Sequence, residues 1–87
     1  MGRNVLATFK IMPESPEVDL SKLREEIKNL KVGEIKDIKE EPIGYGLKAL
    51  KVLVLVPDEG GLIEQIEQKL AKLKGVQTAE NEGVNLI

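Results

Sequence analysis

The chain has 87 residues and a net charge of only -2, from 13 Lys and Arg against 15 Asp and Glu, which predicts one domain over residues 1–87. This balance excludes the strongly basic surface of a nucleic-acid-binding or membrane-surface protein, and no apolar run approaches the roughly 20 residues that span a bilayer, so we expect a cytoplasmic protein. The chain has no cysteine and no histidine, which excludes disulfides and the usual zinc sites and removes the commonest general base, so we expect no metal, no cofactor and no enzyme.

The first predicted element is a strand with one fully buried face, because apolar residues alternate along it with a period of two: Val5, Ala7, Phe9 and Ile11. Pro13 and Pro16 end this strand. Asp19 then predicts the N-terminal cap of a helix. The apolar stripe of that helix is Leu20, Leu23, Ile27 and Leu30, and Gly33 is its stop signal.

Residues 34–43 are mostly charged, with apolar residues three apart, and this pattern predicts a half-exposed or bulged strand at a sheet edge. After the turn Gly44-Tyr45-Gly46, residues 47–56 have the densest apolar content of the chain and predict a central strand. A second helix is predicted from the spacing of Ile63, Ile66, Leu70 and Leu73, with its C-terminal cap at Gly75. Residues 76–81 predict a last, polar strand, and residues 84–87 are apolar again.

The order β-α-β-β-α-β predicts a ferredoxin-like α+β sandwich, a four-stranded antiparallel sheet with two helices on one face and the strands in the order four, one, three, two. We expect the turn at Tyr45 and the C-terminal residues Asn85, Leu86 and Ile87 to lie at the same end of the sheet, roughly 15 Å apart.

This fold hosts many functions, so the residues have to discriminate between them. An RNA reader needs aromatic residues on its strands, whereas the central strands offer Phe9 alone. An acylphosphatase-like site needs an Arg in a phosphate-binding loop, and neither Arg3 nor Arg24 lies in one. A small-ligand regulatory module that works as a dimer, with paired sheet edges, stays open as an alternative.

Three segments match a known family: residues 5–16, residues 18–20 and, most specifically, the motif that begins Pro42-Ile43-Gly44-Tyr45-Gly46 and ends at Leu50. The whole chain resembles the archaeal translation elongation factor 1-beta family, which is similar to the catalytic C-terminal domain of the eukaryotic factor. The resemblance implies this same fold and a guanine-nucleotide exchange factor. Such a factor binds elongation factor 1-alpha, promotes the release of GDP so that GTP can enter, and makes no covalent bond.

The resemblance also assigns site residues. Tyr45, held between two glycines, corresponds to the docking aromatic of the family, and Lys48 to a basic residue of the same motif. The eukaryotic domain has a lysine next to its C-terminal residue that is implicated at the magnesium site, whereas no lysine follows Lys74 here. The predicted partner-binding set is Pro42, Ile43, Gly44, Tyr45, Gly46, Lys48, Asn85, Leu86 and Ile87, on a chain that is monomeric when free.

Two simpler interpretations stay open at this stage. Tyr45 can fold back on the sheet to cover apolar surface, and Leu86 and Ile87 can be buried at the end of the last strand. The carboxylates Glu40, Glu41, Glu80 and Glu82 are interpreted as solvated residues of polar strand faces.

Overall fold

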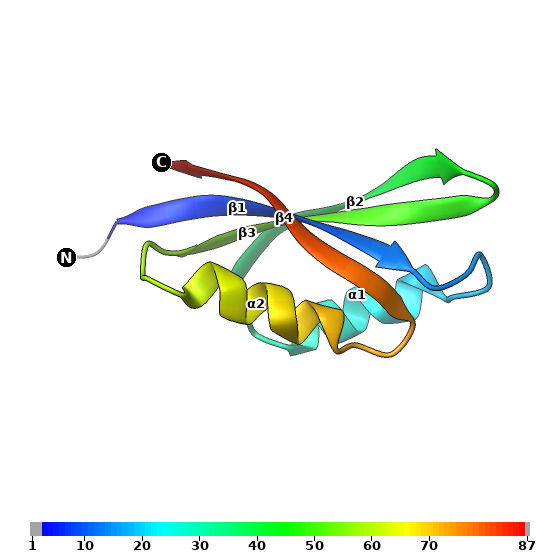
Figure 1. Cartoon of the computed structure of the whole chain (residues 1–87). Coiled ribbons are helices and arrows are strands. Elements are labelled where there is room, and N and C mark those ends of the chain that lie inside the picture. Colours follow the sequence, from blue (N-terminus) through cyan, green and yellow to red (C-terminus); the bar gives the residue numbers. More distant parts are fainter. Residues whose placement is uncertain (1–2, 87) are drawn as a thin grey trace.

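The structure, a computed structural model, describes residues 3–86 and contains six elements. They are β1 (Asn4–Pro13), α1 (Leu20–Asn29), β2 (Glu34–Gly44), β3 (Leu47–Pro57), α2 (Leu62–Ala71) and β4 (Val76–Leu86). The strands form one antiparallel sheet in the order β2-β3-β1-β4, and both helices lie on the same face of it (Figure 1). This confirms the predicted ferredoxin-like fold and its strand order.

The core lies between the sheet and the two helices. The predicted face of β1 is buried along its whole length, and Phe9 at its centre is 0% exposed. The adjacent strand β3 contributes Val52, Val54 and Val56 to the same layer. The helices close it from the other side with Leu23, Ile27, Ile66 and Leu70. One aromatic ring and many aliphatic side chains therefore make up this core.

The helix boundaries follow local capping chemistry. The Asp19 carboxylate accepts hydrogen bonds from the backbone amides of Ser21 at 3.0 Å and Lys22 at 3.3 Å, which confirms the predicted cap of α1. The prediction that α2 continues to a cap at Gly75 is wrong, since the helix ends at Ala71 and Gly75 belongs to the turn into β4. Neither helix of the described chain is long and apolar enough to cross a membrane.

Both edge strands contain bulges. In β2 the pairing with β3 shifts between Ile35 and Asp37, as expected for a bulged edge strand. In β4 one shift lies at Glu82, because Phe9 pairs with Asn81 whereas Thr8 pairs with Gly83, and a second lies at Gln77, because Met12 pairs with Thr78 whereas Pro13 pairs with Val76. The separate segments predicted at 76–81 and 84–87 are thus one strand through Leu86, with Glu82 as an extra residue.

The two regions that were expected to share one end of the sheet lie at opposite ends. Leu86 pairs with Val5 at the start of β1, whereas the β2–β3 turn lies beyond Leu47, at the end of the sheet where β1 finishes (Figure 1). The expectation of neighbouring positions is wrong because β3 is antiparallel to β1, so that the beginning of β3 lies beside the end of β1. The length of β3, 11 residues, separates the two ends by about 33 Å.

Candidate functional site

The turn between β2 and β3 places Tyr45 in an unfavourable backbone conformation. Gly44 pairs with Leu47, which leaves Tyr45 and Gly46 as a two-residue loop with φ values of 55° and 76°. Two positive φ angles are typical of a type I′ hairpin turn, for which Asn-Gly is the preferred sequence. A side chain in the left-handed region costs roughly 1–2 kcal/mol, and only Gly, Asn and Asp adopt it readily. The fold thus accommodates a tyrosine where its backbone favours a different residue.

The side chain of Tyr45 does not pack against the rest of the described fold, so it does not offset the cost of this backbone conformation. It is 99% exposed, so the described residues leave the ring uncovered. The interpretation of a tyrosine that folds back on the sheet is therefore wrong. An aromatic ring held away from the molecule on a two-residue turn has the geometry of an anchor for a pocket on another molecule.

Lys48 lies beside this turn and takes part in a chain of charges. Its Nζ is 3.8 Å from Oε1 of Glu40, and the other oxygen of that carboxylate accepts a hydrogen bond from Arg24 of α1 at 2.9 Å. The Lys48 side chain is nevertheless 56% exposed. It therefore remains accessible to an acidic group of a partner.

A groove runs from this part of the hairpin to the loop between β1 and α1. It has a volume of about 270 Å³ and is lined by Pro13, Ser15, Pro16, Val18, Leu20, Glu40, Gly46 and Lys48. Pro16 lies close to Gly46, since a Cβ atom built on that glycine would be 3.9 Å from the proline ring. The β1–α1 loop therefore extends the surface that begins at Tyr45.

The other residues predicted for the site are dispersed. Pro42 is exposed and Ile43 half-buried, both on the hairpin with Tyr45. Asn85 is exposed at the far end of the sheet, where it pairs with Leu6. Leu86 is described only as the last backbone position of β4, and Ile87 lies outside the described residues. The structure thus brings together the predicted residues from Pro42 to Lys48 and separates them from Asn85.

Sequence reasoning did not single out Val84. Among the described residues the exposed large hydrophobic side chains are Tyr45 and Val84, the latter with 45% exposure. The two lie near opposite ends of the sheet, one in the turn and one in the last third of β4. The available signal was the position of Val84 as an apolar residue between Gly83 and Asn85 in a polar strand. The bulge at Glu82, and so the face of the sheet on which Val84 lies, could not be read from the sequence.

The face of the sheet opposite the helices carries a charged cluster of Glu41, Lys51 and Glu82. Nζ of Lys51 lies 2.9 Å from Glu41 and 3.5 Å from Glu82. The hydrogen bond from Lys51 holds the pKa of Glu41 below its ordinary value, and Glu41 raises the pKa of Lys51 in return. A carboxylate whose pKa is lowered stays ionised at neutral pH, so Glu41 is not suited to the role of a general acid.

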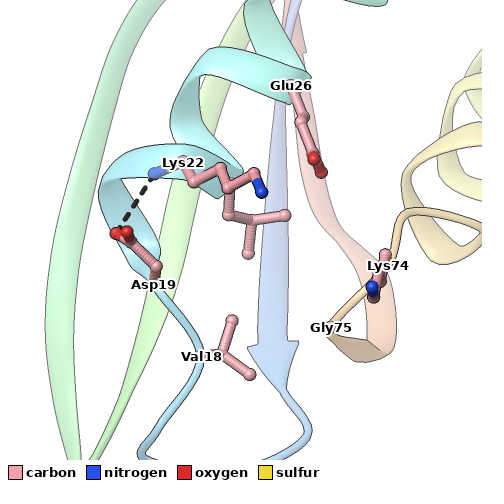
Figure 2. A pocket seen from close by; sticks show the side chains of 7 residues that line it. Val18, Asp19, Lys22, Glu26, Lys74 and Gly75 are labelled. Carbon is pink, nitrogen blue, oxygen red and sulfur yellow. Dashed lines mark hydrogen bonds between the residues drawn. The ribbon is translucent and has the colours of Figure 1, made fainter.

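A further pocket of about 200 Å³ lies between the start of α1 and the turn into β4 (Figure 2). Lys22 and Lys74 are among its lining residues, and such a pair could attract an anion. The Asp19 carboxylate, however, already accepts the amide hydrogens at this helix start and adds its own negative charge. The backbone amides of Ser21 and Lys22 are therefore not free to bind an anion in this pocket.

Comparison with known proteins gives one consistent family. The EF-1 guanine nucleotide exchange domain matches residues 6–87. Elongation factor 1-beta of Methanoregula boonei is 51% identical over 77 residues, which covers 88% of this chain and 89% of that protein. Elongation factor 1-beta of Methanocorpusculum labreanum is 43% identical over 81 residues and covers 93% of both chains.

Two solved structures share the fold at low sequence identity. The ACT domain from GTP pyrophosphokinase of Chlorobium tepidum aligns with a TM-score of 0.62 at 18% identity, over 90% of this chain and 97% of that one. The C-terminal domain of the MgtC protein from Mycobacterium tuberculosis aligns with a TM-score of 0.60 at 14% identity, over 99% of this chain and 89% of that one. At these identities the likeness concerns the fold alone.

Proposed function

The chain belongs to the EF-1 guanine nucleotide exchange domain family and has a role in nucleotide exchange during translation elongation; from this premise we propose that its partner is the GTPase elongation factor 1-alpha. It binds the nucleotide-free state of the GTPase more tightly than the GDP-bound state. By linkage, such a partner weakens GDP binding by the same factor. No covalent bond is made or broken, so the chain acts as an exchange factor and not as an enzyme. The proposed function also implies a cytoplasmic protein.

The observation that carries this proposal is the combination of strain and exposure at Tyr45. Its φ of 55° is unfavourable for a bulky residue, and its 99% exposure means that packing does not offset this cost. A residue held in an unfavourable conformation without benefit to the fold indicates a function outside the fold. Docking of the ring into a pocket of the GTPase supplies that function, with Lys48 beside it as a charged contact.

The separation of the two candidate regions constrains how the partner is engaged. Tyr45 and Asn85 lie at opposite ends of a sheet whose strand β3 is about 33 Å long. The two regions are therefore separate parts of the surface. In the proposed complex the hairpin therefore supplies affinity at one place on the GTPase, and the end of β4 acts at a second place.

The alternative, a small-ligand regulatory module that dimerises through its sheet edges, gains no support from the edge strands. The pairing of β2 shifts at two places, between Ile35 and Asp37 and between Pro42 and Gly44, and the pairing of β4 also shifts at two places, at Gln77 and at Glu82. Bulges interrupt the straight row of free backbone groups that edge-to-edge pairing needs. We therefore propose a monomer in the free state, without direct nucleic-acid or membrane contacts.

The experiment that tests the proposal measures the release of a fluorescent GDP analogue from purified elongation factor 1-alpha of the same source. Substoichiometric amounts of this chain should accelerate release with turnover. The Tyr45→Ala variant is the matched control, since it should accelerate release less while its Tm stays close to that of the unmodified chain. No acceleration, with a GTPase shown to bind nucleotide, would overturn the proposal. Light scattering with and without amino acids would then test the dimeric alternative.

A further inference from the structure

The loop between β1 and α1 is held in place by hydrogen bonds at both of its ends. The backbone amide of Glu14 donates to the carbonyl oxygen of Gly75, in the turn before β4, at 2.9 Å. Ser15 accepts two hydrogen bonds, one on its carbonyl oxygen from the amide of Val18 and one on Oγ from the amide of Glu17, both at 3.3 Å. The loop is therefore ordered before a partner binds, so docking against it costs little further conformational entropy.

This loop forms one wall of the groove of about 270 Å³, and the hairpin of β2 and β3 forms the other. The loop and the turn of the hairpin lie at the same end of the molecule (Figure 1). The loop side is apolar through Pro16 and Val18, and Pro16 is exposed. Pro16 is also the loop residue next to Gly46. Because Gly46 follows Tyr45 directly, the groove begins one residue from the exposed ring.

Tyr45 alone is too small to be a whole docking surface. A specific interface covers roughly 800 Å² on each partner, whereas one aromatic side chain buries about 150–250 Å². A partner that receives the ring must therefore also cover the surface around the turn. The groove adjoins the turn through Gly46, so it belongs to the surface that such a partner covers.

The charges of the groove favour an acidic group. Its charged lining residues are Glu40 and Lys48. Glu40 already accepts a hydrogen bond from Arg24 at 2.9 Å, and Nζ of Lys48 lies 3.8 Å from the same carboxylate with its side chain 56% exposed. Two cations thus share one carboxylate, and one positive charge of this cluster has no counter-charge within it. A carboxylate of a partner would supply that counter-charge.

We propose that the groove receives a segment of the GTPase that packs an apolar side chain against Pro16 and Val18 and places a carboxylate beside Lys48. This inference rests on the proposed exchange function and deepens it, because it extends the docking surface from the ring of Tyr45 to the β1–α1 loop. The loop supplies apolar contact area, and Lys48 selects for an acidic group.

Amide hydrogen exchange of the unmodified chain tests the contact directly. The chain is measured by mass spectrometry alone and with an excess of nucleotide-free GTPase. Residues 44–47 of the turn should exchange more slowly in the complex, and so should the loop amides of Ser15, Glu17 and Val18. A protected turn beside an unchanged loop would rule out the groove contact and leave Tyr45 as the anchor.

The nucleotide-release assay measures how much the groove contributes. Pro16→Ala removes the exposed ring, and it should raise the concentration for half-maximal exchange roughly fivefold. Glu17→Ala is the matched control, since Glu17 is the next exposed residue of the loop and is not among the residues that line the groove. It should stay within about twofold of the unmodified chain. Circular dichroism during heating confirms that both variants are folded. Equal effects of the two substitutions would contradict the inference.

The acidic group is tested through the dependence on salt. Lys48→Met keeps the aliphatic part of the side chain but removes its charge, so its half-maximal concentration should rise less steeply with salt than that of the unmodified chain. Lys39→Met is the matched control, because Lys39 is an exposed lysine of the same hairpin that pairs with Lys51 on the open face of the sheet. Unchanged salt dependence in Lys48→Met would eliminate the carboxylate beside it. If the unmodified chain itself fails to release GDP, the proposed function fails instead.

Discussion

Phe9 and Tyr45, the two aromatic residues of the chain, occupy opposite environments. Phe9 sits in the middle of a central strand with 0% exposure, and it belongs to a core cluster that includes residues of both helices and of β3. Tyr45 sits in a two-residue turn with 99% exposure. The difference shows that burial and function are separate in this small domain. One ring stabilises the fold, and the other is available to a partner at a cost to the fold.

The largest effect that this comparison predicts is the loss of Phe9. Phe9→Ala removes the only aromatic ring of an aliphatic core and leaves a cavity under the helices, which should lower the free energy of unfolding by about 3–5 kcal/mol. For a domain of this size each kcal/mol corresponds to a fall in Tm of about 4–8 °C. Circular dichroism during heating measures the change. A loss below about 1 kcal/mol would mean that the core closes over the cavity without the ring.

The second prediction is that one substitution at Tyr45 raises stability and weakens exchange. Tyr45→Asn produces the Asn-Gly sequence that a type I′ turn prefers, so the free energy of unfolding should rise by roughly 0.5–1 kcal/mol. The same substitution removes the proposed anchor. A residue of that kind contributes about 2 kcal/mol or more to binding, so the concentration for half-maximal exchange should rise about 30-fold. Thermal unfolding and the nucleotide-release assay on the same sample measure both effects.

Tyr45→Phe is the control for that prediction, because it retains the ring and loses only the hydroxyl. We expect exchange within about threefold of the unmodified chain if the ring is the anchor. A Tyr45→Asn variant with greater stability and undiminished exchange would show that the strain at this turn has another cause. A variant that loses both stability and exchange would instead make Tyr45 part of the fold.

Most of the fold is predictable from the sequence because its signals are local. The alternation around Phe9 defines a strand with one buried face, and Asp19 defines the start of a helix through its own carboxylate. The hairpin at Tyr45 follows from the glycines on either side. The order of the elements then restricts the topology to one fold, because crossover connections have a preferred hand.

The remaining features depend on contacts between distant segments. The bulge at Glu82 is stabilised by Glu67 from α2 and by the backbone of Thr8, and these lie 15 and 74 residues away from it in the sequence. No local pattern reports such partners, so the direction of Val84 could not be predicted. The wrong prediction that the C-terminal residues lie beside the Tyr45 turn has a different origin. The predicted fold already makes β3 antiparallel to β1, so the turn that precedes β3 lies at the opposite end of the sheet from the start of β1.

The smallest predicted effect is a change in stability with pH, which we expect from the pair of Glu41 and Lys51 and not from Phe9 or Tyr45. The folded-state pKa of Glu41 lies below its ordinary value of 4.5 because Lys51 donates to it. The stabilising contribution of this pair is therefore present above about pH 4.5 and is lost as the pH falls through the lower folded-state pKa. In Glu41→Gln the amide keeps the size of the side chain but cannot titrate, so the difference in Tm from the unmodified chain should shrink between about pH 6 and pH 3. A constant difference over that range would show that the ion pair does not stabilise the fold. Because Phe9→Ala and Tyr45→Asn leave the pair of Glu41 and Lys51 in place, their effects on stability should be the same at both ends of the range.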